Sequence, residues 1–366
     1  MGPGRAPSRE AAPPRYDWVV VGAGPAGIAA VGKLLDNGLD PRSIKWIDPE
    51  FQVGDFGSRW RNVPSNTKVQ MFLGFLKGCG SFDFDVRGSR LGTMDPQSTC
   101  ILEDMAGPLR LVTRNLMAKV DVSRSSVLGV ERASYGWKLV STAGEVRSRN
   151  VVLAVGAEPR LLDYSKPWIR LEDVFDTARL ASLVSSTDVV GVFGSSHSGV
   201  LSVKNLLEVG VGRIINFYRS PLRYAVDHGD WILYDNTGLK GDVAAWAAEE
   251  MGKVPAERLL RVRSTEASVG RYLPLCTKVV YGVGFESRKL RVEGLDPGYY
   301  DPATGVIGQG VFGCGIAFPE RVVDRSGEDE YNVGLWKFIQ YLDRVVPLWM
   351  ELSGTAVKRA RILSPS

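Results

Sequence analysis

Two glycine-rich segments of this chain have the residue types and spacing that bind phosphate groups. The first is made up of Gly22, Ala23, Gly24, Pro25, Ala26 and Gly27, which fill the pattern Gly-x-Gly-x-x-Gly. Its first glycine permits a tight turn, its second lets the backbone approach a pyrophosphate, and its third lets a helix pack closely on a strand. The free N–H groups at the start of that helix would face the phosphates. The segment therefore predicts a dinucleotide site.

An acidic residue is expected roughly 20 residues after such a motif, where it binds ribose hydroxyls. Asp48 stands 21 residues after Gly27, at the end of an apolar run. Glu50 is the competing ligand, and we prefer Asp48 because it directly ends the predicted strand. With a strand before the motif, a helix after it and an acid in place, a dinucleotide site is favoured over a glycine turn without a ligand.

The second segment is made up of Gly194, Ser195, Ser196, His197, Ser198 and Gly199. It too follows an apolar run and opens a helical pattern, with serine in place of the middle glycine. The next apolar run ends without an acid, and Arg219 occupies the ribose position with Arg223 close behind. A cation there favours a 2′-phosphate over a free 2′-hydroxyl, and so NADPH over NADH. The alternative for Arg219 is a solvated surface arginine.

Each motif needs a strand before it and a helix after it. Hydrophobic periodicity predicts such a unit twice, about 170 residues apart, which indicates two nucleotide folds in tandem. The expected elements are a strand at 17–21, a helix at 25–35 and a strand at 43–48, then a strand at 188–193, a helix at 199–209 and a strand at 213–218.

The remaining segments are predicted with less regular patterns. Residues 120–148 are typical of a β-meander, and 150–155 of another apolar strand. Residues 278–283 follow as a strand. A closing helix is expected from Asn332 to Val346, ended by Pro347.

Bulk composition limits the class of protein. The 366 residues carry a net charge of only +4, too small to indicate nucleic acid or a membrane surface as a partner. No apolar run is long enough to span a bilayer. Four scattered cysteines, with no Cys-x-x-Cys pair, indicate reduced thiols and a cytoplasmic location, and no metal site is expected. Residues 1–15 are predicted to be a disordered tail.

Further motifs extend the pattern beyond glycine. They are Gly57-Ser58-Arg59-Trp60, Pro64-Ser65-Asn66-Thr67 with Met71-Phe72, and Val152-Leu153-Ala154-Val155-Gly156-Ala157-Glu158-Pro159. With the two glycine motifs, they resemble the flavin-containing and N-hydroxylating monooxygenases, within the flavoproteins that have two dinucleotide-binding domains. The resemblance covers most of residues 17–320.

That resemblance implies an α/β fold with two Rossmann-like dinucleotide-binding domains, the NADPH domain being inserted in the FAD domain. We expect the FAD domain at 16–160 and 281–366 and the NADPH domain at 161–280. The return strand is expected at Tyr281–Phe285, and the strand whose end meets the flavin at Val311–Ala317. Beyond the two motifs, Asp48 and Arg219, the expected cofactor contacts are Pro49, Trp60, Val120, Ala154, Gly156, Gly313, Gly315 and Ile316.

The resemblance also implies the chemistry: NADPH reduces FAD, and the reduced flavin then reacts with oxygen. Such an enzyme needs a dry pocket and a few hydrogen-bond donors rather than a metal. Asn66 is the donor we expect beside the flavin, the alternative being that it only caps a turn. The aromatic segment from Tyr224 to Trp246 could line the pocket for a small-molecule substrate, or it could be an ordinary insertion of the NADPH domain.

Three other functions stay open from the sequence. One is an NAD(P)H-flavin reductase that passes electrons to a quinone or a protein, and another is a non-catalytic redox sensor. A disulfide reductase is disfavoured because it needs a redox cysteine pair near the flavin. The oligomeric state is left open.

Overall fold

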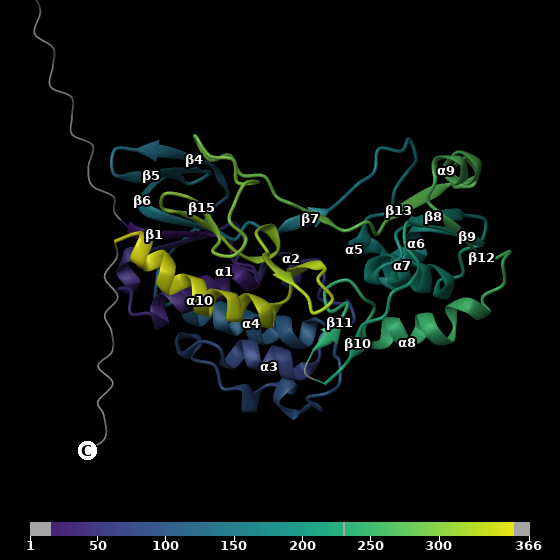
Figure 1. Cartoon of the computed structure of the whole chain (residues 1–366), viewed down its shortest axis with the longest axis horizontal. Coiled ribbons are helices and arrows are strands. Elements are labelled where there is room, and N and C mark those ends of the chain that lie inside the picture. Colours follow the sequence, from purple (N-terminus) through teal and green to yellow (C-terminus); the bar gives the residue numbers. More distant parts are fainter. Residues whose placement is uncertain (1–15, 230, 355–366) are drawn as a thin grey trace, which may run out of the picture.

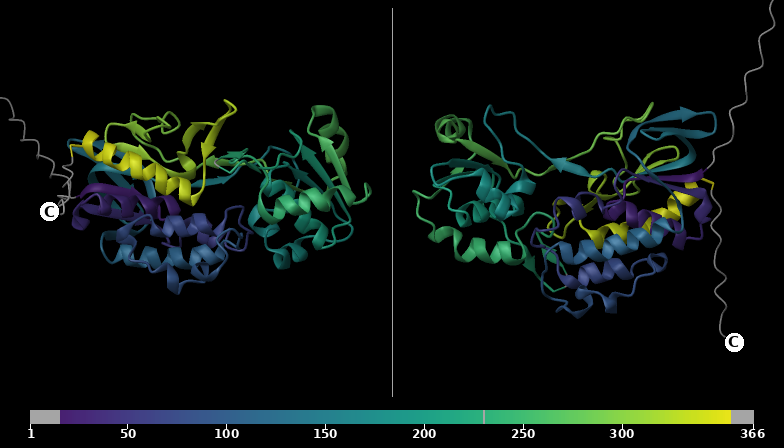
Figure 2. Two further views of the ribbon diagram at one scale, coloured as in Figure 1. Left: turned by 60° about the horizontal axis from the view of Figure 1, so that its bottom comes forward. Right: turned by 180° about the vertical axis from the view of Figure 1, so that it is seen from behind.

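The computed structural model describes residues 16–229 and 231–354, and it shows two lobes joined by extended segments (Figures 1 and 2). The expected tail at 1–15 lies outside the described residues. The smaller lobe contains a parallel sheet and the larger lobe a mixed sheet whose strands β16, β6, β1, β2 and β3 are parallel, so the predicted α/β fold with two Rossmann-like sheets is confirmed. The limits given for each domain stay a prediction.

The elements of the larger lobe come from both ends of the chain. Its helices are α1 (Pro25–Asp36), α2 (Gly54–Ser58), α3 (Val69–Lys77), α4 (Glu103–Met117) and α10 (Leu335–Leu352). Its strands are β1 (Tyr16–Val21), β2 (Ile44–Asp48), β3 (Asp121–Arg124), β4 (Val127–Ala133), β5 (Gly136–Ser141), β6 (Gly144–Leu153), β15 (Val306–Gly308), β16 (Val311–Gly313), β17 (Glu320–Val323) and β18 (Asp329–Asn332).

The elements of the smaller lobe come from the middle of the chain. Its helices are α5 (Leu171–Val174), α6 (Thr177–Leu183), α7 (His197–Glu208), α8 (Gly241–Glu249) and α9 (Glu266–Tyr272). Its strands are β8 (Val189–Phe193), β9 (Arg213–Tyr218), β10 (Val226–Asp227), β11 (Ile232–Leu233), β12 (Leu259–Arg263) and β13 (Lys278–Tyr281). The antiparallel strands β7 (Ala157–Pro159) and β14 (Phe285–Ser287) link the lobes.

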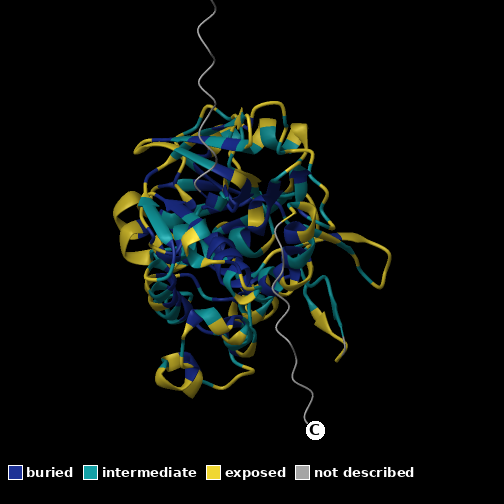
Figure 3. Ribbon diagram, turned by 90° about the vertical axis from the view of Figure 1, so that its left-hand side faces the viewer, coloured by how far each residue is buried: buried dark blue, intermediate teal, exposed yellow. Residues whose placement is uncertain are grey.

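The sheet of the larger lobe is covered on both faces, which explains the uninterrupted apolar sequence of β1. Its order is β15-β16-β6-β1-β2-β3, with β5 and β4 added beside β6. Trp18 and Val20 pack in the core formed with α1, α3, α4 and α10, whereas Val19 and Val21 face the core under β4 and β5. Buried residues lie in the interior of the molecule and exposed residues lie mainly on its outer loops and helix faces (Figure 3). The smaller lobe has the all-parallel order β12-β9-β8-β13.

Three strands differ from the sequence-based prediction in their pairing or in their limits. β3 is not part of a meander: it pairs in parallel with β2, because α4 provides the crossover that a parallel strand needs. The strands expected around Ser148 and Asn150 are one continuous strand, β6. The expected return strand 281–285 is interrupted, since β13 ends at Tyr281 and β14 begins at Phe285.

The closing helix differs most. It begins at Leu335 and continues past Pro347 to Leu352. A proline inside a helix costs about 3 kcal/mol. Here the last turns bury Trp349, whose indole stacks on Phe312 at 5.0 Å and donates to the Thr304 carbonyl at 2.6 Å. This packing outweighs the helix-breaking tendency of the proline.

Within the described residues, the search for a helix long and apolar enough to cross a bilayer found none.

Candidate active site

The first glycine motif forms a tight turn between β1 and α1. Gly22 has φ +105°, and a side chain on Gly22 or Gly27 would overlap a backbone carbonyl, that of Ala154 or that of Gly22 respectively. Gly24 is different, because no atom lies within 4 Å of the place where its Cβ would stand. Helix α1 begins there with no side-chain cap and no acid in its first turn. The geometry therefore leaves N–H groups and open space for an anion such as a pyrophosphate.

Asp48 closes this turn from the end of β2. Its carboxylate accepts hydrogen bonds from the backbone nitrogens of Ala23 (2.8 Å), Glu50 (2.9 Å) and Phe51 (2.7 Å), and the residue is only 8% exposed. A carboxylate has about four acceptor positions, so one is left for a ribose hydroxyl. The side chain of Glu50 is exposed beside it, as is Pro49.

The structure places Val120 away from the first glycine turn, and its contact with a cofactor stays a prediction. In the register of β2 and β3, Asp121 pairs with Lys45 and Arg124 with Asp48. Val120 therefore lies at the opposite end of the strand, roughly 13 Å away along it, and is buried in the core. Ligands of such sheets bind at the carboxyl ends of the strands.

Arg124 is the residue that the sequence analysis missed at this position. It lies over the Phe51 ring at 5.4 Å and donates to the Glu50 carbonyl at 2.6 Å, beside Asp48. Assigning Asp121–Arg124 as a parallel strand would have found it.

Two further segments meet the start of α1. The crossover residue Ala154 follows β6 and donates its backbone N–H to the Val21 carbonyl at 2.9 Å. β16 runs parallel to β6 and ends at Gly313, and a side chain on Gly315 would collide with Ala26. Ile316, beyond it, is partly exposed. Ala154 and Gly315 thus lie against the first glycine turn and the start of α1.

Arg288 is a second residue that the sequence analysis missed. Arg288 directly follows β14. Its guanidinium group donates hydrogen bonds to the carboxylate of Asp55 in α2, to the carboxylate of Glu158 in β7 at 3.1 Å, and to the carbonyl of Val155 at 3.3 Å. It lies against Gly156, where φ is +77°. No local pattern indicates these contacts, because Arg288 and Asp55 are 233 residues apart. The arginine ties both linker strands to the larger lobe.

The second glycine motif repeats the construction of the first. Gly194 has φ +113°, and side chains on Gly194, Gly199 or Gly282 would overlap one another's backbone. Gly282 thus has the place that Ala154 has beside Gly22, which explains why the return strand breaks there. Helix α7 also begins with no side-chain cap bond and no acid in its first turn.

A cavity of about 420 Å³ opens in front of this second turn. Arg219 lies in its wall and is exposed, and no other described residue forms an ion pair or hydrogen bond with its guanidinium group. Arg160 and Arg223 line the same cavity, and Arg223 also lies over the Tyr234 ring at 5.2 Å. The further lining residues are Leu162, Phe193, Gly194, Ser195, Ser196, Phe217, Ser220, Pro221, Thr237, Ser264, Gly282, Val283 and Gly284. Three cations and an uncapped helix start suit a ligand with several phosphates.

His197 connects the second motif with the loop that holds Asn66. Burial lowers the pKa of its imidazole, an effect that the nearby backbone of Pro64 opposes, and its Nδ1 is buried with no hydrogen-bond partner among the described residues. Asn66 itself is exposed, with its Oδ1 3.3 Å from the Thr67 hydroxyl. Ser65, not Asn66, caps the turn, since its Oγ accepts from the backbone nitrogen of Thr67 at 2.8 Å. The amide of Asn66 is therefore available as a donor.

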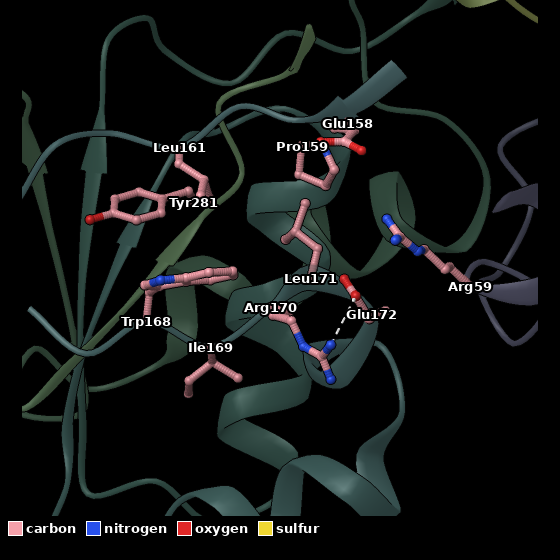
Figure 4. A pocket seen from close by; sticks show the side chains of 10 residues that line it. All are labelled: Arg59, Glu158, Pro159, Leu161, Trp168, Ile169, Arg170, Leu171, Glu172 and Tyr281. Atoms are coloured by element: carbon pink, nitrogen blue, oxygen red, sulfur yellow. Dashed lines mark ion pairs between the residues drawn. The ribbon is translucent and has the colours of Figure 1, made fainter. Parts of the chain in front are cut away.

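Between the lobes lies a second recess, of about 210 Å³ (Figure 4). Trp168 and Tyr281 form one side, and Arg59 reaches in from the larger lobe on the other. Trp168 is 47% exposed, so the recess offers an aromatic surface. Trp60, next to Arg59, packs edge-on to Phe285 at 5.9 Å, which places it at the junction of the lobes.

The four cysteines, which the structure describes, are all free thiols and all buried. Cys314 lies between Gly313 and Gly315, where burial raises the pKa of its thiol to about 12. A thiol that stays protonated is a poor nucleophile. The site therefore lacks the dithiol that a disulfide reductase of this fold needs.

No protein-family model matches the chain. Among characterised proteins it is similar to monooxygenase AgnR1 of Paecilomyces divaricatus, with 32% identity over 390 residues, 93% of this chain and 99% of AgnR1. The chain belongs to the same family as this monooxygenase. The resemblance that the motifs suggested is thereby confirmed.

Solved structures agree with the fold of this family of monooxygenases. A flavin-containing monooxygenase from Stenotrophomonas maltophilia has a TM-score of 0.63 at 16% identity, over 92% of this chain and 98% of that one. The bacillithiol disulfide reductase of Staphylococcus aureus has a TM-score of 0.62 at 11% identity, over 92% and 99%. The thioredoxin reductase of Lactococcus lactis has a TM-score of 0.56 at 13% identity, over 93% and 100%. Identities this low show the fold alone.

Proposed function

We propose that this monooxygenase uses FAD and NADPH to insert one oxygen atom of O₂ into a small-molecule substrate. The observation that carries the proposal is that both lobes have the same arrangement: a tight glycine turn followed by a helix whose first turn has no side-chain cap. This arrangement suits the binding of phosphate groups. The 32% identity to a monooxygenase supports oxygen, not a thiol, as the acceptor of the electrons.

The first glycine turn together with the start of α1, which we call the first cradle, fits FAD. The N–H groups at the start of α1 would hold its pyrophosphate, the remaining acceptor position of Asp48 would bind its ribose, and the segment from Gly313 to Ile316 would lie along its flavin half. When bound, FAD accepts a hydride from NADPH and passes the electrons to O₂, so that one oxygen atom enters the substrate and the other leaves as water.

The second glycine turn together with the start of α7, which we call the second cradle, fits NADPH. The start of α7 would hold the pyrophosphate, and Arg219 would pair with the 2′-phosphate by charge-assisted hydrogen bonds. Asn66 would donate a hydrogen bond close to the flavin, from a loop whose Pro64 backbone lies beside His197 at the start of α7. The chain's own part in the chemistry is thus to orient two nucleotides and to exclude water from the space between them.

The test is the stoichiometry of purified enzyme with NADPH, O₂ and a panel of small aromatic and aliphatic compounds. We expect NADPH-dependent oxygen uptake in which a true substrate lowers the hydrogen peroxide released per NADPH and yields an oxygenated product by mass spectrometry. Hydrogen peroxide equal to NADPH consumed with every compound would instead indicate a reductase or oxidase.

The buried thiols fit a reducing compartment, and we include a cytoplasmic location in the proposal.

A further inference from the structure

Residues 224–229 and 231–240 of the smaller lobe reach the larger lobe, and we call these residues the clasp. It contains β10 and β11, which pair antiparallel, and it leads into α8. Figure 1 shows β10 and β11 between the lobes on the side away from the linker strand β7. The clasp is therefore a contact between the lobes separate from the linker strands, and Trp60 and Val63 of the larger lobe add another by packing in the core of the smaller lobe.

The centre of the clasp is held by a buried carboxylate of the larger lobe. Glu330 of β18 is 7% exposed. It accepts hydrogen bonds from the Asn236 side chain at 2.7 Å, from the Asn236 backbone nitrogen at 3.3 Å and from the Thr237 hydroxyl at 3.4 Å. Burying a carboxylate is unfavourable unless hydrogen-bond donors compensate for the lost water. The clasp supplies these donors to Glu330, so the contact favours one position of the clasp against the larger lobe.

A cation of α10 holds the same turn from the other side. Lys337 forms an ion pair with Asp235 and donates to the Asn236 side-chain oxygen at 2.6 Å. Lys240 also pairs with Asp235. Burial alone would raise the pKa of Asp235, but the hydrogen bonds from Lys240 and Lys337 lower it, so the ion pairs persist at neutral pH.

The clasp also touches the parts that the proposed function uses. Asp227 lies 3.6 Å from Lys68, two residues after Asn66. A side chain on Gly241, directly after the clasp, would stand 3.3 Å from the Ser65 carbonyl. Thr237 lines the dinucleotide cavity as well as contacting Glu330. One short segment thus contacts the second cradle, the Asn66 loop and the C-terminal part of the larger lobe.

We propose that the clasp fixes the NADPH-binding lobe in the orientation that hydride transfer needs, with Asn236, Glu330 and Lys337 as positioning residues. The inference rests on the proposed function. Its physical basis is that β7 and β14 form a short two-stranded link about which the lobes could turn, and the polar contacts of the clasp restrict that turning in addition to the apolar packing of Trp60 and Val63. Misplacement of reacting groups by about 1 Å can lower a rate by roughly 100-fold.

The decisive variant is Asn236→Asp, which places a second carboxylate against Glu330 without leaving a cavity. We expect the dissociation constant of NADP⁺ to change less than about twofold, since the phosphate cradle is intact, and the limiting rate of flavin reduction at saturating NADPH to fall about tenfold or more. Adding Glu330→Gln to Asn236→Asp restores a donor–acceptor pair across the lobes with the roles exchanged. We expect this double variant to recover most of the rate.

Lys253→Met is the matched control, because Lys253 forms an exposed pair with Glu250 at 2.9 Å away from the clasp. Lys337→Met serves as a second clasp variant if Asn236→Asp does not fold. Unchanged reduction rates in folded clasp variants, or equal losses in NADP⁺ affinity and rate without rescue, would overturn the proposal. Absence of NADPH-dependent flavin reduction in the wild type would instead overturn the proposed function.

Discussion

The carboxylate of Asp48 accepts a hydrogen bond of 2.8 Å from the backbone nitrogen of Ala23, so that the acid at the end of β2 also closes the glycine turn. Asp48→Ala would leave three backbone N–H groups without this acceptor, those of Ala23 and Phe51 buried and that of Glu50 partly buried. Each such group costs about 1–3 kcal/mol. We expect the variant to lose at least about 2 kcal/mol of unfolding free energy in urea and to bind less FAD. Full stability with loss of FAD alone would mean that the carboxylate binds only the ribose.

The glycines of the first motif should separate into two classes. The Cβ of Gly24→Val meets no atom within 4 Å outside its chain neighbours, so we expect a folded chain that no longer carries FAD, because the side chain fills the space for the phosphate. Gly27→Val meets the Gly22 carbonyl, so we expect a loss of about 1–3 kcal/mol in stability. Circular dichroism and flavin absorbance of the purified variants distinguish the two. Normal flavin content in the Gly24 variant would contradict the FAD site.

Arg219 should determine the choice of nicotinamide cofactor. Losing a charge-assisted bond to the 2′-phosphate removes roughly 1.5–3 kcal/mol, so Arg219→Ala should raise the KM for NADPH roughly 10- to 100-fold and leave the KM for NADH nearly unchanged. Steady-state kinetics with both cofactors measure this. Arg87→Ala, which removes an exposed arginine paired with Asp85, is the control. Equal effects on both cofactors would mean that Arg219 does not contact the 2′-phosphate.

Cys314 should be dispensable for electron transfer. It is fully buried and its pKa is raised to about 12 by burial, so the thiolate does not form at working pH. We expect Cys314→Ser to keep NADPH-dependent flavin reduction and most of the turnover, and iodoacetamide at pH 8 to leave the folded enzyme active. Loss of turnover with flavin reduction intact would return the disulfide-reductase function to consideration.

Acid should weaken the smaller lobe through Asp188. Burial raises the pKa of this carboxyl, but hydrogen bonds from Lys278, Thr277 and Ser185 outweigh it and lower the pKa from 3.8 to about 2. Because the pKa is lower in the folded than in the unfolded chain, the ionised carboxylate stabilises the fold above about pH 4, and this stabilisation is lost as the pH falls through about 2. The shift in pKa corresponds to about 2–3 kcal/mol of unfolding free energy. Lys278→Met should therefore be less stable than wild type in urea at pH 7, with a difference that shrinks toward pH 2. A difference that does not change with pH would rule out this ion pair as its cause.

The sequence by itself determined the two nucleotide units and the core of each turn. These features are local: a glycine with positive φ, a helix start and an apolar strand are each specified within a few residues, so Gly22 to Gly27 and Gly194 to Gly199 could be read directly. The positions of Asp48 and Arg219 followed, because each ends the strand after its motif. Similarity to a family added the Asn66 loop and the crossover at Ala154.

Only the tertiary structure decided which distant residues meet. Strand order and register placed Arg124, not Val120, beside Asp48, and packing against Phe312 let α10 continue through Pro347. The contacts of Arg288 with Asp55 and of Asn236 with Glu330 join residues 233 and 94 positions apart. No local pattern encodes such pairs, because a polar residue on a loop has the same sequence signature whether it faces water or another lobe. Charge and hydrogen bonding between the lobes are therefore properties of the fold, whereas the phosphate-binding turns are properties of short stretches of chain.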